Sequence, residues 1–191
     1  MATVLVPLAA GFEDLEAVTI TDLLRRAQVE VVTAGLSDGP IRGSRGTAII
    51  PDTTLDRALT RDYDMIVLPG GQPGATHLEQ DARIRALLQK MAKQGRYTAA
   101  ICAAPKVLAA AGLLDGKRAT SFPGSLEAGL FPKVRIESLD VIADGKVITS
   151  RGPGTAMDFA LTLIELLAGA DKRNQVEAGL HRPASHRQGE S

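Results

Sequence analysis

Short runs of β-branched and aliphatic residues alternate along the chain with longer segments in which apolar residues recur every three or four positions. The short runs predict strands, and the longer segments predict amphipathic helices. The expected strands are 3–8, 30–34, 48–51, 65–68, 96–102, 134–142 and 146–150, and the expected helices are 13–26, 82–94, 105–111 and 154–167. Because the two alternate, the pattern predicts an α/β protein in which a mostly parallel sheet has helices on both faces.

Local patterns refine three parts of this picture. The first expected helix contains a stripe at spacings of three and four, and we expect it to face the core; it consists of Leu15, Val18, Thr19, Asp22, Leu23 and Arg26. The dipeptide Asp144–Gly145 separates the last two expected strands and is a strong signal for a two-residue hairpin. From about residue 175 the sequence is polar and contains Pro and Gly, so we expect a flexible tail there.

The composition fits one domain spanning residues 1–191, since 191 residues with 45% hydrophobic content can bury a core of their own. The 22 basic and 22 acidic side chains cancel, which argues against a surface that attracts nucleic acid or anionic membranes by bulk charge. No apolar run approaches the roughly 20 residues that a membrane-spanning helix needs. A small or neutral partner is therefore favoured.

Cys102 is the only cysteine, so the chain can form neither an internal disulfide nor a cysteine-rich zinc site. A single cysteine agrees with a cytoplasmic location. The segment Gly112–Arg118 lacks the spacing and the Ser or Thr of a phosphate-binding loop. We therefore expect neither a metal nor a cofactor.

The segment 97–105 predicts a sharp strand-to-helix turn with Cys102 at its centre. A buried strand ends in small residues, and Pro105, which suits a first helical turn, follows within three positions. Such a turn presents its central side chain at the carboxyl edge of the sheet, where open α/β folds bind ligands. The free N–H groups and the dipole at the helix start favour a thiolate, which makes Cys102 a candidate nucleophile or oxidation sensor. The alternative is that Cys102 is simply a small buried hydrophobic residue.

A glycine-rich loop at residues 68–74 follows an expected strand and leaves the sheet at the same edge. The backbone amides of Gly71 and Ala103 are candidates for an oxyanion hole, because such donors stabilise negative charge that develops on a substrate oxygen. The alternative is an ordinary glycine-rich turn after a strand.

Three carboxylates lie at the start of the first expected helix. Glu13 and Asp14 are explained as favourable partners of the helix dipole. Glu16, if it lies beside Cys102 in an enclosed site, would be pushed toward its protonated form, donate a hydrogen bond to the thiolate and shuttle a proton. The alternative is a solvated glutamate.

The three histidines do not predict a Cys-His-Asp hydrolase, which needs a histidine near its nucleophile. His181 and His186 lie in the polar tail, and His77 follows the glycine-rich loop, where we expect an exposed side chain near a helix start.

Four ordered motifs in this chain resemble those of the ThiJ/PfpI superfamily, most closely its DJ-one-like branch. They are Glu16 after the first strand and the segments 67–71, 99–105 and 149–155, and the resemblance extends from Val4 to about Val176. It implies a flavodoxin-like three-layer sandwich, a homodimer and a nucleophile-elbow Cys102 paired with a protonated Glu16.

The resemblance also implies roles for residues around this pair. Gly71 and Ala103 match the backbone anion-binding positions of the family. Arg45 matches a basic residue that reaches the site near the dimer interface, and Arg26 lies at a similar interface position.

Two departures from the family narrow the expected chemistry. The protease-like branch has a histidine directly after the cysteine, where this chain has Ala103, so we do not expect peptidase activity. Phe122 stands where the human member has a histidine near the cysteine, which leaves proton transfer to Glu16 and bound water.

The activity implied by the resemblance is cysteine-dependent detoxification of reactive carbonyls, with a role in stress protection. The chain would be a glutathione-independent glyoxalase or deglycase acting on methylglyoxal or its adducts, and nucleic acid would be a partner only as a glycated substrate. The alternative is a redox-sensing protective protein or chaperone in which Cys102 is oxidised to a sulfinic acid, without physiological turnover. An association of relatives with thiamine-pathway metabolism has no supporting site in this sequence.

Overall fold

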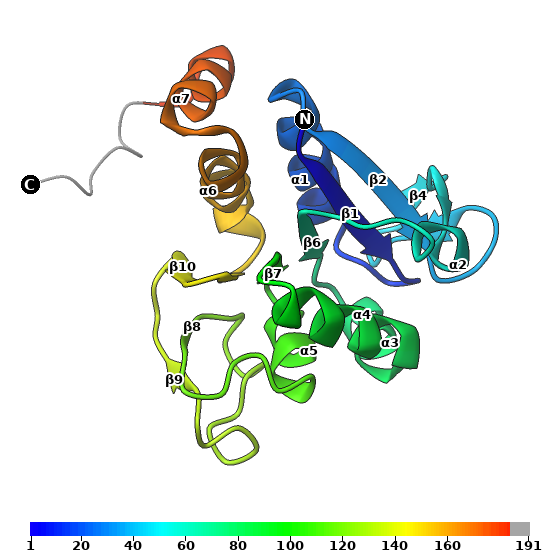
Figure 1. Ribbon diagram of the computed structural model, residues 1–191, viewed down its shortest axis with the longest axis vertical. Coiled ribbons are helices and arrows are strands. Elements are labelled where there is room, and N and C mark those ends of the chain that lie inside the picture. The colour runs from blue at the N-terminus through cyan, green and yellow to red at the C-terminus, as the bar shows by residue number, and fades with distance from the viewer. Residues whose placement is uncertain (184–191) are drawn as a thin grey trace, which may run out of the picture.

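The computed structural model describes residues 1–183, and its central feature is a seven-stranded sheet in the order β10-β11-β7-β6-β1-β2-β5 (Figure 1). These strands are β1 (Thr3–Leu8), β2 (Glu30–Gly35), β5 (Thr53–Thr54), β6 (Met65–Leu68), β7 (Tyr97–Ile101), β10 (Val141–Asp144) and β11 (Val147–Ser150). Every neighbouring pair is parallel except β10 and β11, which form the expected hairpin. Two small sheets pair β3 (Ile41–Arg42) with β4 (Ala48–Ile49) and β8 (Arg118–Ala119) with β9 (Arg135–Ile136).

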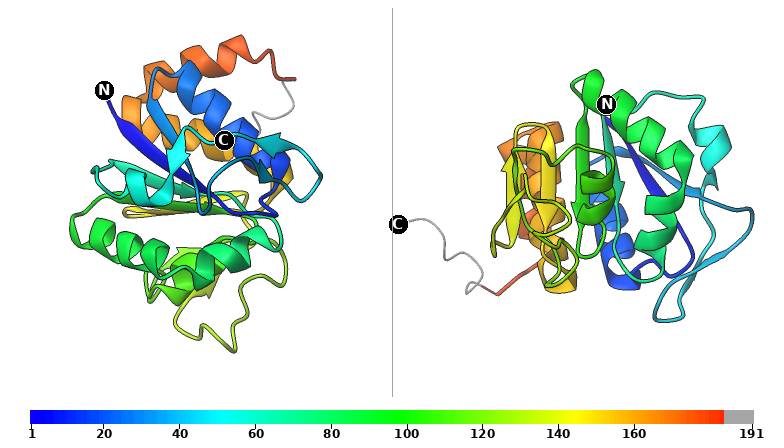
Figure 2. Two further views of the ribbon diagram at one scale, coloured as in Figure 1. Left: turned by 90° about the vertical axis from the view of Figure 1, so that its right-hand side faces the viewer. Right: turned by 90° about the horizontal axis from the view of Figure 1, so that it is seen from below.

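Helices cover both faces of the sheet and form a three-layer sandwich (Figure 2). One apolar cluster joins the sheet to α1 (Asp14–Arg26), α6 (Ala156–Ala168) and α7 (Ala170–Gly179). The other cluster lies on the opposite face and includes α2 (Leu55–Ala58), α3 (Gly74–Gln80), α4 (Ala82–Lys93) and α5 (Pro105–Ala110). A single-turn 3₁₀ helix, η1 (Pro153–Thr155), precedes α6.

Alternation along the central strand explains how one sheet serves two cores. Val4 and Val6 of β1 belong to the cluster under α1 and α6, whereas Leu5 belongs to the cluster under α4 and α5. Because side chains point to both buried faces, the strand is apolar at successive positions, as is typical of a parallel sheet. The predicted flavodoxin-like α/β class is confirmed.

The face of α1 that packs on the sheet differs from the predicted stripe. The helix buries Asp14, Glu16, Ala17, Ile20, Leu23 and Leu24. Of the predicted stripe only Leu23 is buried, while Leu15 and Val18 are 51% and 49% exposed. The prediction was wrong because the buried face carries two carboxylates, which a hydrophobicity pattern assigns to solvent.

The C-terminal segment and the region before the hairpin also differ from expectation. The chain is helical through Gly179 instead of loose from residue 175, because Val176 is buried against the core and Arg182 pairs with Asp158 at 2.7 Å. The remainder of the expected tail, residues 184–191 with His186, lies outside the described residues. The expected strand 134–142 is instead divided between β9 and β10. Within residues 1–183, none of the helices is long and apolar enough to cross a membrane.

Candidate active site

Cys102 lies on the turn between β7 and α5 with its backbone in the left-handed region, at φ 63°. Few residues other than glycine adopt this conformation, and here hydrogen bonds hold it in place. The Cys102 N–H donates to the Ser150 carbonyl at 2.9 Å, and the Cys102 carbonyl accepts from the Phe122 N–H at 2.8 Å. The strand–turn–helix geometry predicted for the cysteine is therefore present, at the carboxyl edge of the sheet.

Gly70 and Gly71 allow the loop that follows β6 to approach the Cys102 turn. A Cβ added at Gly70 would lie 2.7 Å from the Cys102 Cβ and 2.9 Å from the Ala103 nitrogen, which is closer than side-chain carbons pack. Gly71 has φ 88°, which favours glycine. The two loops thus place the backbone amides of Gly71 and Ala103 where both act to lower the pKa of the Cys102 thiol.

Glu16 lies on the buried face of α1 with its side chain fully enclosed. Its Oε2 accepts a hydrogen bond of 2.8 Å from the Gly70 N–H, while Oε1 has no hydrogen-bond partner within residues 1–183. Burial raises the pKa of Glu16 from 4.5 to about 7, although the Gly70 N–H and the Cys102 thiol act to lower it. Glu16 is therefore a buried carboxyl next to the cysteine, not a solvated glutamate, and both its protonated and its ionised form are accessible near neutral pH.

Cys102 is buried, and its protonation depends on Glu16. Burial first, and then the negative charge of Glu16, raise the pKa of the Cys102 thiol to about 12, while the amides of Gly71 and Ala103 lower it. Burial and the negative charge of Glu16 therefore oppose the thiolate, which the two backbone amides favour. Protonation of Glu16 removes the second of these effects, because the carboxylate charge then disappears, and so lowers the cost of the thiolate.

Arg45 does not point at the cysteine in the single chain. Its side chain is 78% exposed, and its Nε lies 3.9 Å from Glu13 Oε2. The loop that carries Arg45 is fixed by Asp14, which accepts hydrogen bonds from the Arg45 N–H at 2.9 Å and the Thr47 N–H at 2.8 Å. This anchoring role of Asp14 could not be predicted from the sequence, since an aspartate in a first helical turn has a sufficient explanation in the helix dipole.

Neither of the two histidines within the described residues is placed to act as a catalytic base for Cys102. His77 is exposed on α3 with its Nδ1 3.0 Å from the Ala10 carbonyl oxygen, and His181 is exposed just after α7. Neither arrangement supplies the hydrogen-bonded histidine of a Cys-His-Asp hydrolase.

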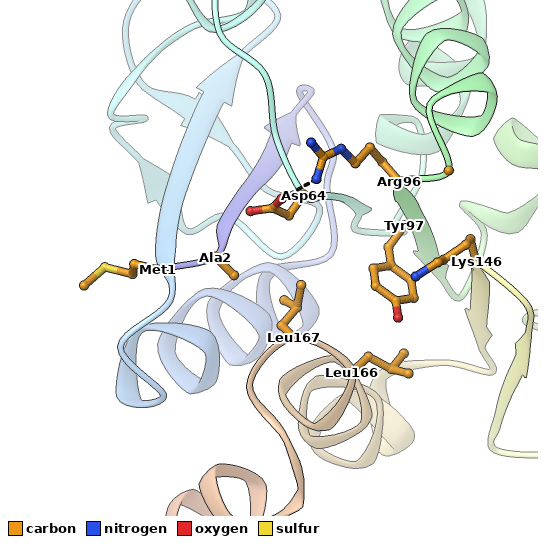
Figure 3. Close-up of a pocket in the computed structure, with 9 residues that line it drawn as sticks. Met1, Ala2, Asp64, Arg96, Tyr97, Lys146, Leu166 and Leu167 are labelled. Carbon is orange, nitrogen blue, oxygen red and sulfur yellow. Dashed lines mark hydrogen bonds and ion pairs between the residues drawn. The ribbon is translucent and has the colours of Figure 1, made fainter.

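A pocket of about 390 Å³ opens at the amino end of β7, the opposite edge of the sheet from Cys102 (Figure 3). Its charged groups are already engaged with each other or with an aromatic ring. Arg96 binds Asp64 at 2.6 Å, and the Lys146 ammonium lies 3.8 Å from the centre of the Tyr97 ring. The pocket is thus separate from the chemistry at the cysteine.

The fold and this site define a class: flavodoxin-like α/β proteins with a cysteine on a nucleophile elbow and a buried carboxyl beside it. The model of the DJ-1/PfpI family matches residues 2–166, and the chain belongs to this family.

Curated relatives match over nearly the full chain. Protein dj-1beta of Drosophila melanogaster is 41% identical over 177 residues, which cover 92% of this chain and 95% of the relative. The Parkinson disease protein 7 homolog of Danio rerio is 40% identical over 179 residues, covering 92% and 95%. The glutathione-independent glyoxalase DJR-1.2 of Caenorhabditis elegans is 35% identical over 164 residues, covering 86% and 87%.

Solved structures show the same architecture. The crystal structure of Drosophila melanogaster DJ-1beta superposes with a TM-score of 0.89 at 41% identity and covers 94% of this chain and 97% of its own. Oxidized Toxoplasma gondii DJ-1 gives a TM-score of 0.88 at 37% identity, covering 94% and 98%. The assignment to the DJ-1 branch therefore rests on both sequence and structure.

Proposed function

We propose that this protein detoxifies reactive carbonyls as a glutathione-independent glyoxalase or deglycase that acts on methylglyoxal or its adducts. The observation that supports it most directly is the enclosed pair of Cys102 and Glu16 under two backbone N–H donors. A relative at 35% identity is named as a glutathione-independent glyoxalase, which supports the same chemistry.

The reaction converts methylglyoxal and one water molecule to lactate. The Cys102 sulfur adds to the aldehyde carbon while the carbonyl oxygen takes a proton, giving a hemithioacetal. The hydrogen on that carbon then leaves as a proton and another proton is added at the neighbouring ketone carbon. The first carbon is thereby oxidised to a thioester and the second is reduced to an alcohol. Water cleaves the thioester, which releases lactate and restores the thiol.

Each chemical step has a residue of the site that would assist it. The N–H groups of Gly71 and Ala103 would stabilise the negative oxygen formed by sulfur addition. Glu16 would take the thiol proton, deliver it to the substrate and later accept the proton released from carbon. A pKa of about 7 suits this exchange, since a proton shuttle works best when its pKa lies near the operating pH.

The test is lactate formation from methylglyoxal by purified protein without added glutathione. Cys102→Ser should abolish turnover, because an alcohol in place of the thiol is a far weaker nucleophile at this pH. Glu16→Gln should also lose turnover, and Glu165→Gln, on the exposed side of α6, is the matched control that should retain it. If wild-type protein forms no lactate above the Cys102→Ser background, the proposal is wrong.

A redox-sensing function is the second candidate, and the same anion-binding surroundings favour it. A sulfinate at Cys102 would accept hydrogen bonds from the Gly71 and Ala103 N–H groups and from protonated Glu16. Two peroxide molecules supply the two oxygen atoms and leave as two water molecules. Mass spectrometry of peroxide-treated protein should find two added oxygen atoms on the peptide that contains Cys102. This function is favoured over turnover if oxidation occurs and lactate does not form.

We further propose that the chain works as a homodimer in the reducing cytoplasm, where Cys102 remains a free thiol. The exposed apolar side chains Val18 on α1 and Ile50 after β4 line one surface hollow, and Leu15 is exposed one turn before Val18; this grouping supports a dimer, since monomers rarely expose contiguous apolar patches. Val18→Asp should shift a dimer toward monomer in sedimentation or light scattering. A wild-type monomer at micromolar concentration would contradict this part of the proposal.

A further inference from the structure

Phe122 is a half-exposed aromatic residue fixed next to the elbow cysteine. Its side chain is 49% exposed, although its backbone N–H is bonded to the Cys102 carbonyl at 2.8 Å. The Phe122 carbonyl in turn accepts the Ser125 N–H at 2.9 Å and the Ser121 hydroxyl at 3.1 Å. The ring is thus exposed on a backbone that several hydrogen bonds hold in place.

The direction of the Phe122 ring follows from its contact with Gly152. A Cβ added at Gly152 would lie 3.5 Å from Phe122 Cδ2, so the ring covers the backbone at Gly152. Gly152 lies two residues after Ser150, whose carbonyl accepts the Cys102 N–H at 2.9 Å. The backbones of Phe122 and Ser150 thus both bond to Cys102, and the Phe122 ring lies over the chain just after Ser150.

We propose that Phe122 is a specificity-determining residue that makes the site prefer 2-oxoaldehydes with an aromatic substituent over methylglyoxal. This inference rests on the proposed glyoxalase function and names the substrate class of that site. When the aldehyde carbon is bonded to the Cys102 sulfur and its oxygen faces the Gly71 and Ala103 amides, the substituent extends toward the remaining wall. The half-exposed Phe122 ring would form part of that wall, and it would gain contact area and ring–ring attraction from an aryl group and little from a methyl group.

The chemical step is unchanged by the substituent. Phenylglyoxal and one water molecule give mandelate: the aldehyde carbon is oxidised to a carboxylate and the ketone carbon is reduced to an alcohol. No oxidant, reductant or further reactant is needed. The preference arises from binding of the substituent, so it should appear mainly in KM.

The experiment compares kcat/KM for phenylglyoxal and for methylglyoxal in each protein, with Cys102→Ser as the blank for non-enzymatic reaction. The ratio within one protein cancels any general loss of activity or folded fraction. Phe122→Ala should lower the phenylglyoxal-to-methylglyoxal ratio roughly threefold to tenfold, the range of an aromatic pair, mainly through KM. Phe122→Tyr should keep the ratio because it retains the ring. Leu130→Ala removes a 69% exposed apolar side chain from the same region and is the control that should leave the ratio unchanged.

The outcomes separate this inference from the proposed function. If wild-type protein converts methylglyoxal and the ratio is the same in wild type and Phe122→Ala, the specificity assignment is wrong while the glyoxalase function stands. An equal fall in the ratio for Leu130→Ala would also overturn it, since the effect would not belong to Phe122. If wild-type protein converts neither substrate, the proposed function fails and this inference fails with it.

Discussion

Glu16 should make the protein less stable as the pH rises from about 4.5 to about 7, and Glu16→Gln should remove this effect. The carboxyl has a pKa of about 7 in the folded chain because burial disfavours its charge, against an ordinary value of 4.5. Between these two values the unfolded chain has released the proton while the folded chain still holds it. Unfolding is therefore favoured progressively as pH rises through this window, and the effect levels off above pH 7.

The magnitude follows from the width of the window. The interval from 4.5 to about 7 is roughly 2.5 pH units, and each unit corresponds to about 1.4 kcal/mol, so the ionised carboxylate costs about 3 kcal/mol above neutrality. Glutamine has nearly the same shape, and its amide oxygen can still accept the Gly70 N–H that Glu16 accepts at 2.8 Å. The variant should therefore lose little packing and gain most of this free energy at alkaline pH.

The assay is urea denaturation of wild type and Glu16→Gln at steps from about pH 5 to about pH 8, followed by far-UV circular dichroism. The difference between the two free energies of unfolding should grow by about 2.5 kcal/mol from about pH 5 to about pH 8, because all other titrating groups cancel. Glu165→Gln removes an exposed carboxylate and should give a difference that stays within about 0.5 kcal/mol. A flat difference for Glu16→Gln would refute the assignment of the raised pKa.

Two further predictions concern the same site. Glu16→Gln should speed alkylation of Cys102 by iodoacetamide near pH 8, because loss of the carboxylate charge lowers the pKa of the thiol; slower alkylation would contradict the coupling of the two groups. Gly70→Ala should destabilise the fold by about 2 kcal/mol in urea denaturation and strongly reduce turnover, because its Cβ would fall 2.7 Å from the Cys102 Cβ. A variant with unchanged stability and turnover would show that the two loops are less closely packed than described.

The sheet and the elbow could be predicted from the sequence because their signals are local. The strand at Thr3–Leu8 has the predicted bounds, and the Asp144–Gly145 hairpin forms as expected. The segment around Cys102 combines an apolar strand, small residues and a proline, which together leave little freedom for the backbone. In these segments a few neighbouring residues are enough to determine the local backbone conformation.

The face of α1 could not be predicted, because its buried carboxylates depend on partners far away in the chain. Asp14 bonds to the N–H groups of Arg45 and Thr47, more than 30 residues on, and Glu16 bonds to the N–H of Gly70, 54 residues on. A buried carboxylate is tolerated only where such donors are present. The sequence of a helix contains the polar side chains but not their distant donors, so its more apolar stripe is predicted as the core face.

Gly70 explains why the Glu16 carboxyl and the Cys102 thiol lie next to each other. Its carbonyl accepts the Glu13 N–H at 2.9 Å and its N–H donates to Glu16, so one residue fixes the start of α1 to the loop after β6. Its missing side chain lets the same loop pack against the strained turn of Cys102. The distance between proton donor and acceptor is thus set by backbone hydrogen bonds rather than by mobile side chains. A site built in this way would be preorganised for the proposed proton exchange, and the conformational strain at the cysteine is balanced by the bonds around it.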